Sequence, residues 1–430
     1  MDFGKKSFIQ IKTFAYLFRF MKKKVKEQNI YFLENIISHN DSKQSENEFS
    51  TAILLKASEE SSLKNDEDNH NIISEIITNS QIQNFKEGQY VYYKKQNFEN
   101  ANTTSIAKRN VYYNNYLRGR LMKLNENRQY ENIPFYKPEI YSYHINVGHG
   151  NCSIVVIKDI KKTKLWMVDC SEFDFLNRQN YYSNIESCFD HIIEKFKLKR
   201  IHIEKFFLTH THYDHYSGIN RLINNGYINS NTVFFLNLHY SMPSENYNRL
   251  LRNLVLIKPL IIEPLTSYSN DNISIWHPHK TTIRTNTPNY NAQDVEIELS
   301  PNNSSAVYHL KFGDLSILLP GDIEQEGWNT ITQCKVHLNH SSYFSISHHG
   351  SINGHLRDRC PVGRSIQDLS NCIMPKSTPI LMGRNGAYNG VYSSHVLADF
   401  NNIACSEKDS MNNPSNFLEI NWQNNNKNWY

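Results

Sequence analysis

Three histidines and one aspartate lie within six consecutive positions of the chain, at His210, His212, Asp214 and His215. Imidazole and carboxylate groups are the ligands that suit zinc, manganese or iron. Four such side chains on one turn can converge on a small volume, and an aspartate beside three histidines allows one turn to serve two ions. This spacing therefore predicts a metal site.

The segments on either side of the cluster predict a strand-to-helix turn. The apolar run at 206–208 has the pattern of a buried strand, and Ile219, Leu222 and Ile223 follow at helical spacing. Gly226 is placed to end that helix as a C-cap. The metal ligands would then leave the end of a strand and enter the first turn of a helix.

Further elements are predicted on both sides of this turn. Alternating or apolar patterns predict strands at 141–147, 152–157 and 165–168, and a helix follows around 185–196. Downstream, the patterns predict strands at 232–238, 260–262, 273–276, 343–347 and 379–382, a hairpin through 305–319, and helices at 246–256 and from about 394. Strands that alternate with helices predict an α/β domain.

The segment 209–215 resembles the His-x-His-x-Asp-His signature of the metallo-β-lactamase superfamily. Four other segments resemble, in the same order, the branch that contains the nuclease-like domain of the DNA-uptake channel proteins: 146–153 with Val168 and Asp169, 302–307, 318–322, and 348–351. The resemblance covers about residues 140–400. It implies an αββα sandwich and a hydrolase domain over residues 136–430.

The resemblance also implies roles for the ligands. His210 and His212 would bind one ion, Asp214 and His215 a second, and Asp322 would bridge the two. One histidine of the pair His348 and His349 would complete the second site, but alternation along the preceding strand does not decide which. The cofactor implied is a pair of divalent ions, with Zn²⁺ preferred over Mn²⁺.

The family pattern contains one more histidine, between the first cluster and the bridging aspartate. The candidates here are His239, His277, His279 and His309, and none has the usual glycine-flanked context. This departure leaves the occupancy of the first metal site open.

The expected chemistry is attack by a hydroxide, because a divalent ion brings the pKa of bound water to about 7. Asp214 could hold that hydroxide and accept its proton, with His349 and Asp169 as the other catalytic candidates. Asp169 either orients a ligand histidine or forms the turn at the end of its strand.

Four residues are candidates for substrate binding: His149, Asn151, Ser305 and Arg384. Arg384 lies in a glycine- and asparagine-rich loop at 383–390 that resembles the family's late loop but lacks its histidine. This arginine could bind phosphate or be an ordinary solvated side chain.

Composition sets weaker limits. The net charge of +4 permits nucleic acid as a partner without requiring it. Seven cysteines, an odd number with no Cys-x-x-Cys, favour reduced thiols and a cytoplasmic protein. The apolar run at 14–21 contains Arg19 and is too short to span a membrane, and no cleavage site for a signal peptide follows it.

Residues 1–135 carry no recognisable chemical motif and read as a mainly helical and irregular extension. Helices are expected within 1–40, ending in a lysine-rich segment, with a linker at 41–70, a short helix at 53–55, a strand at 90–93 and a basic helix or loop from Arg118 to Arg128. For the helices within 1–40, with their lysine-rich end, docking on the catalytic domain or on a protein partner is preferred over contact with a membrane surface or nucleic acid.

Three functions follow from these residues. The first is a phosphodiesterase or nuclease, because two divalent ions with two aspartates leave a charge near +2 that attracts an anionic substrate. The second is a peptidase, esterase or lactonase on the same fold. The third is a non-catalytic subunit. Relatives of this kind in bacteria often belong to antiviral defence systems, so the resemblance also implies such a complex.

Overall fold

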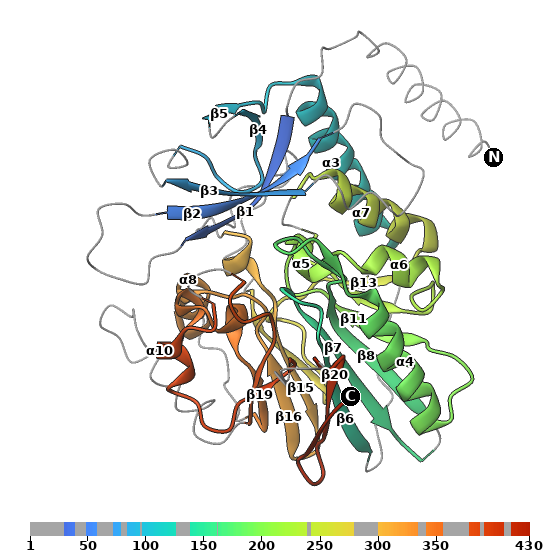
Figure 1. Cartoon of the computed structure of the whole chain (residues 1–430). Coiled ribbons are helices and arrows are strands. Elements are labelled where there is room, and N and C mark those ends of the chain that lie inside the picture. The colour runs from blue at the N-terminus through green and yellow to red at the C-terminus, as the bar shows by residue number, and fades with distance from the viewer. Residues whose placement is uncertain are drawn as a thin grey trace, which may run out of the picture.

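The computed structural model of the chain describes residues 30–38, 49–57, 72–78, 84–94, 97–125, 138–160, 162–238, 242–278, 300–333, 341–355, 378–387, 391–407 and 414–430. None of the helices in these ranges is long and apolar enough to cross a membrane. The largest unit is a pair of packed sheets, with a smaller sheet above them (Figure 1).

The first sheet of the pair has the strand order β13-β12-β11-β8-β7-β6-β20-β21. Its strands are β6 (Glu139–Ile145), β7 (Cys152–Lys158), β8 (Thr163–Cys170), β11 (Ile203–Phe207), β12 (Val233–Phe235), β13 (Leu260–Ile262), β20 (Phe417–Asn421) and β21 (Asn426–Trp429). The strands from β8 to β13 run parallel, and the others pair antiparallel. The carboxyl ends of β8 and β11 therefore meet at one edge, where open α/β sheets bind their ligands.

The second sheet has the order β14-β15-β16-β17-β18-β19. Its strands are β14 (Ile273–His277), β15 (Val307–Phe312), β16 (Leu315–Leu319), β17 (Tyr343–Ser345), β18 (Thr378–Leu381) and β19 (Ala404–Cys405). The pairs from β14 to β16 are antiparallel and those from β16 to β19 are parallel. The hairpin predicted at 305–319 is present as β15 and β16.

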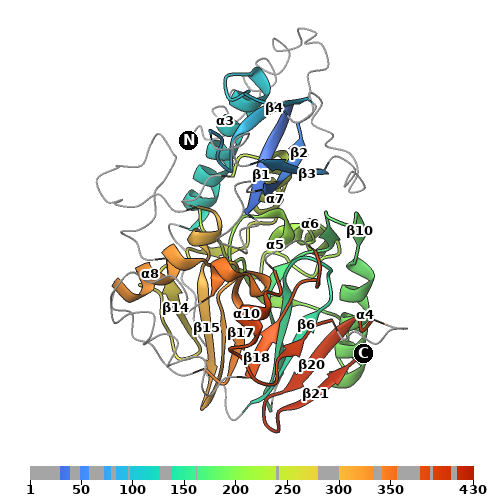
Figure 2. The same cartoon turned by 60° about the vertical axis from the view of Figure 1, so that its left-hand side comes forward.

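Helices cover the outer face of each sheet. The first sheet carries α4 (Tyr182–Phe196), α6 (Ile219–Asn224) and α7 (Glu245–Ile257), and the second carries α8 (Gln325–Gln333) and α10 (Ser394–Leu397) (Figure 2). Short elements complete this part: β9 (Phe173–Asp174), β10 (Gln179–Asn180), α5 (Tyr213–Tyr216) and the 3₁₀ turns Asn302–Ser304, Ser347–Gly350 and Ile352–Gly354.

The apolar core between the sheets follows from alternation along the strands. Phe207 and Phe235 stack in that core with their rings 4.5 Å apart, while Phe206 stacks with Phe234 on the opposite face, toward the helices. Burial of both faces explains why β11 reads as a continuous apolar run. Near the β21 edge of the first sheet, the carboxylate of Glu419 on β20 is buried and forms an ion pair with Lys195 of α4.

Two hydrogen bonds join the sheets beside the 209–215 turn. The hydroxyl of Tyr308 on β15 donates to the carbonyl of Leu208 at 2.8 Å, and the Ala306 N–H donates to the Thr209 carbonyl at 2.7 Å. These bonds bring the segment before β15 against the end of β11. They fix the position of one sheet relative to the other where the predicted ligands lie.

The N-terminal region differs from the prediction. Its described part forms an antiparallel sheet in the order β3-β2-β1-β4-β5, with β1 (Ile30–Ser38), β2 (Phe49–Lys56), β3 (Ile72–Thr78), β4 (Tyr90–Lys94) and β5 (Asn97–Asn100). The run at 53–55, expected as a short helix, lies in β2, because a short apolar run fits a buried strand as well as a helix. The predicted helices before residue 30 lie outside the described residues.

The strand predicted at 90–93 is confirmed as β4, and Arg118 belongs to the helix α3 (Ser105–Asn125). Buried polar contacts attach this region to the sandwich. The Asn114 side chain donates to Asn248 of α7 at 2.8 Å, and the Tyr90 hydroxyl donates to the Pro243 carbonyl at 2.8 Å. The described part of the N-terminal region therefore packs against the sandwich through these side chains.

Candidate metal centre

The turn after β11 has the predicted strand-to-helix geometry. His212 takes the N-cap position of α5 with an extended backbone, so Asp214 and His215 fall in the first helical turn. Residues 209–215 are all buried. The local fold thus gathers the histidines and the aspartate at the carboxyl edge of the first sheet, as the sequence predicts.

Asp169 holds this turn from the end of β8. One carboxylate oxygen accepts the Thr209 N–H at 2.8 Å, and the other accepts the Thr209 hydroxyl at 2.7 Å and lies 2.8 Å from His215 Nδ1. The backbone of Asp169 is left-handed, with φ of 52°. Asp169 was predicted either to orient a ligand histidine or to form the turn at the end of its strand. The contacts favour the first role, with His215 as the oriented histidine, and the left-handed backbone shows that Asp169 also forms the turn.

Four predicted residues converge on one small volume: Asp214, His215, Asp322 and His349. They are buried, and their ligand atoms all lie within 4.8 Å of one another. Asp322 Oδ2 lies 3.3 Å from His215 Nε2 and 3.3 Å from His349 Nε2. Side chains more than 130 positions apart in the sequence therefore meet between the two sheets.

The second sheet presents Asp322 through a close approach to the metal turn. Gly321 has φ of 59°, and a Cβ at that position would lie 2.6 Å from the Thr209 Cβ. Its carbonyl accepts the His348 N–H at 3.2 Å, which ties the loop after β16 to the loop after β17. Only glycine fits here, because the backbone needs both the left-handed conformation and the space.

The structure distinguishes His349 from His348. His349 Nε2 faces Asp322 and lies 3.8 Å from Asp214 Oδ2, whereas His348 Nδ1 lies 3.2 Å from Glu324 and its Nε2 is 4.0 Å from Asp322. Both residues have left-handed backbones, with φ of 52° and 49°. Strand alternation does not apply to such a turn, so the sequence could not separate the two.

His210 and His212 form a second pair at the edge of this cluster. His210 Nε2 lies 3.1 Å from His212 Nδ1, and the rings of His210 and His215 are 4.1 Å apart. Within the described residues, the four-residue cluster does not include either of them. The arrangement agrees with two neighbouring groups of ligands, one of which has two histidines.

The cluster fits a divalent ion by its chemistry and by its buried polar atoms. His215 Nε2, His349 Nε2 and Asp322 Oδ1 are buried, and none has a hydrogen-bond partner among the described residues. Leaving such atoms buried is costly unless they bind something. Nitrogen and carboxylate oxygen donors suit Zn²⁺ and Mn²⁺.

The carboxylates and imidazoles shift one another's pKa. Burial lowers the pKa of His349, but facing Asp322 and Asp214 outweigh burial and raise it to about 9. Burial raises the pKa of Asp214, yet the neighbouring His215 and His349 hold it below its ordinary value. Without an ion His349 therefore retains its proton, and an ion must displace it.

Two of the four candidates for a further histidine ligand, His277 and His309, have other contacts. His277 Nδ1 is 2.8 Å from the Ser305 carbonyl, and His309 packs against the Trp276 ring at 5.1 Å. His239 and His279 lie outside the described residues.

Of the predicted substrate contacts, His149 lies at the cluster. Its Nε2 is 3.5 Å from Asp214 Oδ2 and its ring is 4.3 Å from that of His349. Burial lowers the pKa of His149 to about 3, so the imidazole is neutral. The backbone N–H of Asn151 donates to the Asp214 carbonyl at 3.2 Å, which also places this turn against α5.

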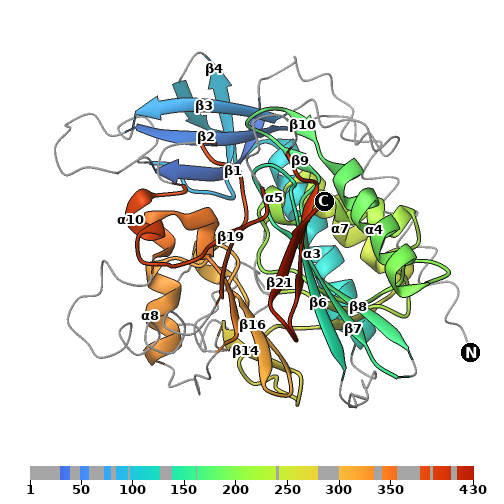
Figure 3. The same cartoon turned by 60° about the horizontal axis from the view of Figure 1, so that its bottom comes forward.

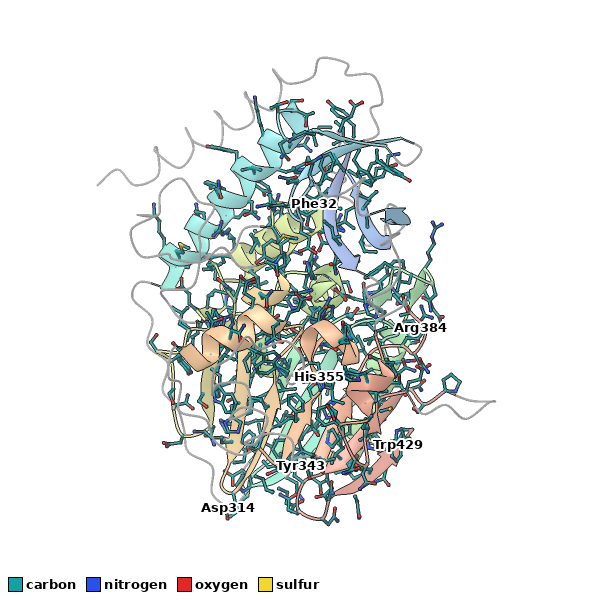
Figure 4. The ribbon with its side chains drawn as sticks, turned by 90° about the vertical axis from the view of Figure 1, so that its left-hand side faces the viewer. Phe32, Asp314, Tyr343, His355, Arg384 and Trp429 are labelled. Carbon is teal, nitrogen blue, oxygen red and sulfur yellow. The ribbon has the colours of Figure 1, made fainter. Side chains whose placement is uncertain are left out.

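Of the other two substrate candidates, Arg384 is held by a structural contact, whereas the buried Ser305 hydroxyl has no hydrogen-bond partner among the described residues. The Ser305 carbonyl faces His277, and Arg384 Nε donates to the buried Asp174 at 2.8 Å. Asp174 also accepts the His149 N–H at 3.0 Å, so Arg384 supports the loop that carries His149. Figure 4 shows Arg384 at the same end of the sandwich as the N-terminal sheet, opposite Asp314.

Two glutamates of the N-terminal region were missed by the sequence analysis: Glu34, which is buried in β1, and Glu87, which is partly exposed in the loop before β4. Glu87 Oε2 lies 3.8 Å from His212 Nε2. Burial raises the pKa of Glu34 to about 8, although His212 opposes that shift. For Glu34 the available signal was a glutamate that follows an apolar run in a strand, whereas Glu87 lies in a polar loop that carries no such signal.

No family model matches the sequence, and no curated protein sequence matches it. Among solved structures, a mutant of the CmlA β-hydroxylase aligns with 67% of this chain and 55% of that chain, at 11% identity and a TM-score of 0.34. The metallo-β-lactamase fold protein YhfI from Bacillus subtilis aligns with 48% of this chain and 71% of that chain, at 10% identity and a TM-score of 0.25. This chain thus spans about half the length of the hydroxylase.

The described architecture has helices on both outer faces of two packed sheets. This is an αββα sandwich, so the α/β class predicted for this part of the chain is confirmed, and it is consistent with the metallo-β-lactamase fold. The resemblance to the DNA-uptake branch stays a prediction.

Proposed function

We propose that the protein is a metal-dependent hydrolase that cleaves phosphodiester bonds in nucleic acid or a nucleotide. The observation that carries the proposal is the buried cluster of Asp214, His215, Asp322 and His349, whose ligand atoms face one another across the two sheets. Two carboxylates and two imidazoles in this arrangement are a metal site with a hydrolytic donor set.

The residues divide into two groups of ligands. Asp214, His215, Asp322 and His349 would hold one divalent ion, and His210 with His212 would contribute to a second. Zn²⁺ suits these nitrogen and oxygen donors, and Mn²⁺ is the alternative. When bound, such ions lower the pKa of water and polarise the bond that is cleaved.

The protein's own groups then orient and move protons. Asp214 Oδ2 lies between His149 and His349, where it can accept a proton from an attacking water. The neutral imidazole of His149 can hydrogen-bond a substrate oxygen at the same place. Asp169 fixes the ring of His215, so that Nε2 keeps facing the cluster.

The charge of the site bears on the substrate class. Two divalent ions and the two ligand aspartates leave a net charge near +2, which favours an anionic substrate. Asp169 and Glu87 stand behind His215 and His212 and reduce that surplus when they are ionised. With these two carboxylates ionised, the site attracts an anionic substrate less strongly. A peptidase, esterase or lactonase acting on a less charged substrate is therefore the second candidate.

A protein partner is part of the proposal, together with a role in a bacterial antiviral complex. The support is the resemblance described above and the exposed face of α3, where Tyr112 is 62% exposed and Tyr116 is 41% exposed. Co-purification of a partner with the full chain, and its loss when both tyrosines are changed to serine, would support this role.

The test is a substrate panel with a metal count. Purified protein loaded with Zn²⁺ or Mn²⁺ is incubated with single-stranded DNA, RNA, cyclic nucleotides, and an ester and lactone series, with Asp214→Ala as the inactive control. Turnover of a phosphodiester that Asp214→Ala loses is the expected result. Turnover of the esters alone would favour the second candidate, and bound metal without any turnover would contradict both.

A further inference from the structure

Glu87 of the N-terminal region reaches the metal turn. It lies in the loop at 84–89 that leads into β4, and its Oε1 accepts the Ile36 N–H of β1 at 2.8 Å. Its other oxygen, Oε2, lies 3.8 Å from His212 Nε2. Figures 1 and 3 both show β1 beside α5, the helix that His212 caps.

The two ring nitrogens of His212 face different partners. Nδ1 lies 3.1 Å from His210 Nε2, and Nε2 faces the Glu87 carboxylate. Two nitrogens bound to one tetrahedral Zn²⁺ at about 2.0–2.1 Å lie ~3.3 Å apart. In this structure the two nitrogens share a hydrogen bond, and their 3.1 Å separation is also close to that of two ligands to one ion, which would leave His212 Nε2 to carry the proton.

His215 also has a carboxylate on the ring nitrogen that faces away from its cluster, in this case at hydrogen-bond distance. There Nδ1 lies 2.8 Å from the Asp169 carboxylate, and Nε2 faces the cluster. A carboxylate that accepts the second N–H of a ligand histidine fixes its tautomer and orientation and makes it a better donor. Asp169 comes from the sandwich itself, whereas Glu87 comes from the N-terminal region.

We infer that Glu87 positions His212 by facing its Nε2–H at ion-pair range, 3.8 Å and longer than a hydrogen bond, so that the N-terminal region is a structural part of the metal centre. This inference rests on the proposed metal site at His210 and His212. It gives the extension a role within the catalytic domain that is separate from any role in binding a partner. Glu87 is a positioning residue, since it acts through His212.

The first test counts ions. Wild type, Glu87→Gln and the control Glu99→Gln are stripped with a chelator and reloaded with Zn²⁺ alone; Glu99 is exposed on β5 of the same sheet. We expect two Zn²⁺ per chain in wild type and in Glu99→Gln. In Glu87→Gln the affinity for one of the two should fall by about 10- to 100-fold while the other is retained.

The second test uses the wild-type chain, so it does not depend on the variant folding. With ¹⁵N-labelled histidine and bound Zn²⁺, the His212 signals, assigned by their loss in His212→Gln, should show a protonated Nε2 and an unprotonated Nδ1. Proton on Nδ1 would overturn the inference, as would two Zn²⁺ bound equally tightly in wild type and Glu87→Gln. A wild type that binds no Zn²⁺ would instead overturn the proposed function and, with it, this inference.

Discussion

Replacing Asp169 by asparagine tests how the metal turn is held. Asparagine has the same shape and tolerates the left-handed backbone, with φ of 52°, that Asp169 adopts. One oxygen can still accept the Thr209 N–H. The new NH₂ group then faces the Thr209 hydroxyl and His215 Nδ1, both of which lie within 2.8 Å of Asp169 Oδ2. His215 Nδ1 must then accept rather than donate.

That change moves the imidazole proton of His215 to Nε2, the nitrogen that lies 3.3 Å from Asp322 and faces the cluster. A protonated Nε2 cannot bind an ion, so the wrong tautomer has to be reversed on binding. We expect a loss of zinc affinity of about 10- to 100-fold, which is ~1.4–2.7 kcal/mol. The metal-free protein should also lose about 2 kcal/mol of stability, because charged hydrogen bonds become neutral ones.

The assay is zinc affinity by competition with a chelator, beside urea unfolding of the metal-free protein. Asp314→Asn is the matched control, because Asp314 is exposed in the turn between β15 and β16 at the far end of the sandwich (Figure 4). Zinc affinity of Asp169→Asn within twofold of wild type would refute the tautomer argument. An equal loss in Asp314→Asn would show that the effect is not specific to the site.

Three further predictions follow from single residues. Asp322→Asn should lower both zinc content and turnover, the latter by at least about 100-fold, measured by metal analysis and initial rates. Gly321→Ala should cost about 2 kcal/mol or more in urea unfolding, because its Cβ would meet Thr209 at 2.6 Å, whereas Gly226→Ala, with nothing within 4 Å, should lose only about 1 kcal/mol. Burial raises the pKa of Glu419, but Lys195 and His191 outweigh burial and lower it below 4.5. Glu419 should therefore stabilise the fold above pH 4.5 and lose that effect as the pH falls further. The difference in unfolding free energy between wild type and Glu419→Gln should shrink below pH 4.5.

The sequence was sufficient for the sandwich and most of its site because these features are local. The strand before His210 and the helix after it are set by apolar spacing, and the side chains of His210 to His215 follow from that turn. The hairpin that leads to Asp322 is likewise set by alternation and a glycine turn. The meeting of Asp322 with His215 came from the family resemblance and not from spacing.

The rest depended on long-range contacts. Of the N-terminal sheet the sequence predicted β4, but the segment 1–40, which contains β1, and the run at 53–55 in β2 were read as helical, because the pairing of short apolar runs is not visible in the sequence. The position of Glu87 beside His212 follows from that pairing. The choice between His348 and His349 depended on two consecutive left-handed residues, which no periodicity encodes.

The hydrogen bonds from Tyr308 and Ala306 to the end of β11 have a mechanical consequence. They couple the two layers of the sandwich at the place where His215 of one layer faces Asp322 of the other. An ion held by both residues would act as a clamp between the layers, so its removal would let them separate at this edge first. Hydrogen exchange of the amides around Ala306 and Thr209 would then report whether the ion is bound, without an assay of turnover.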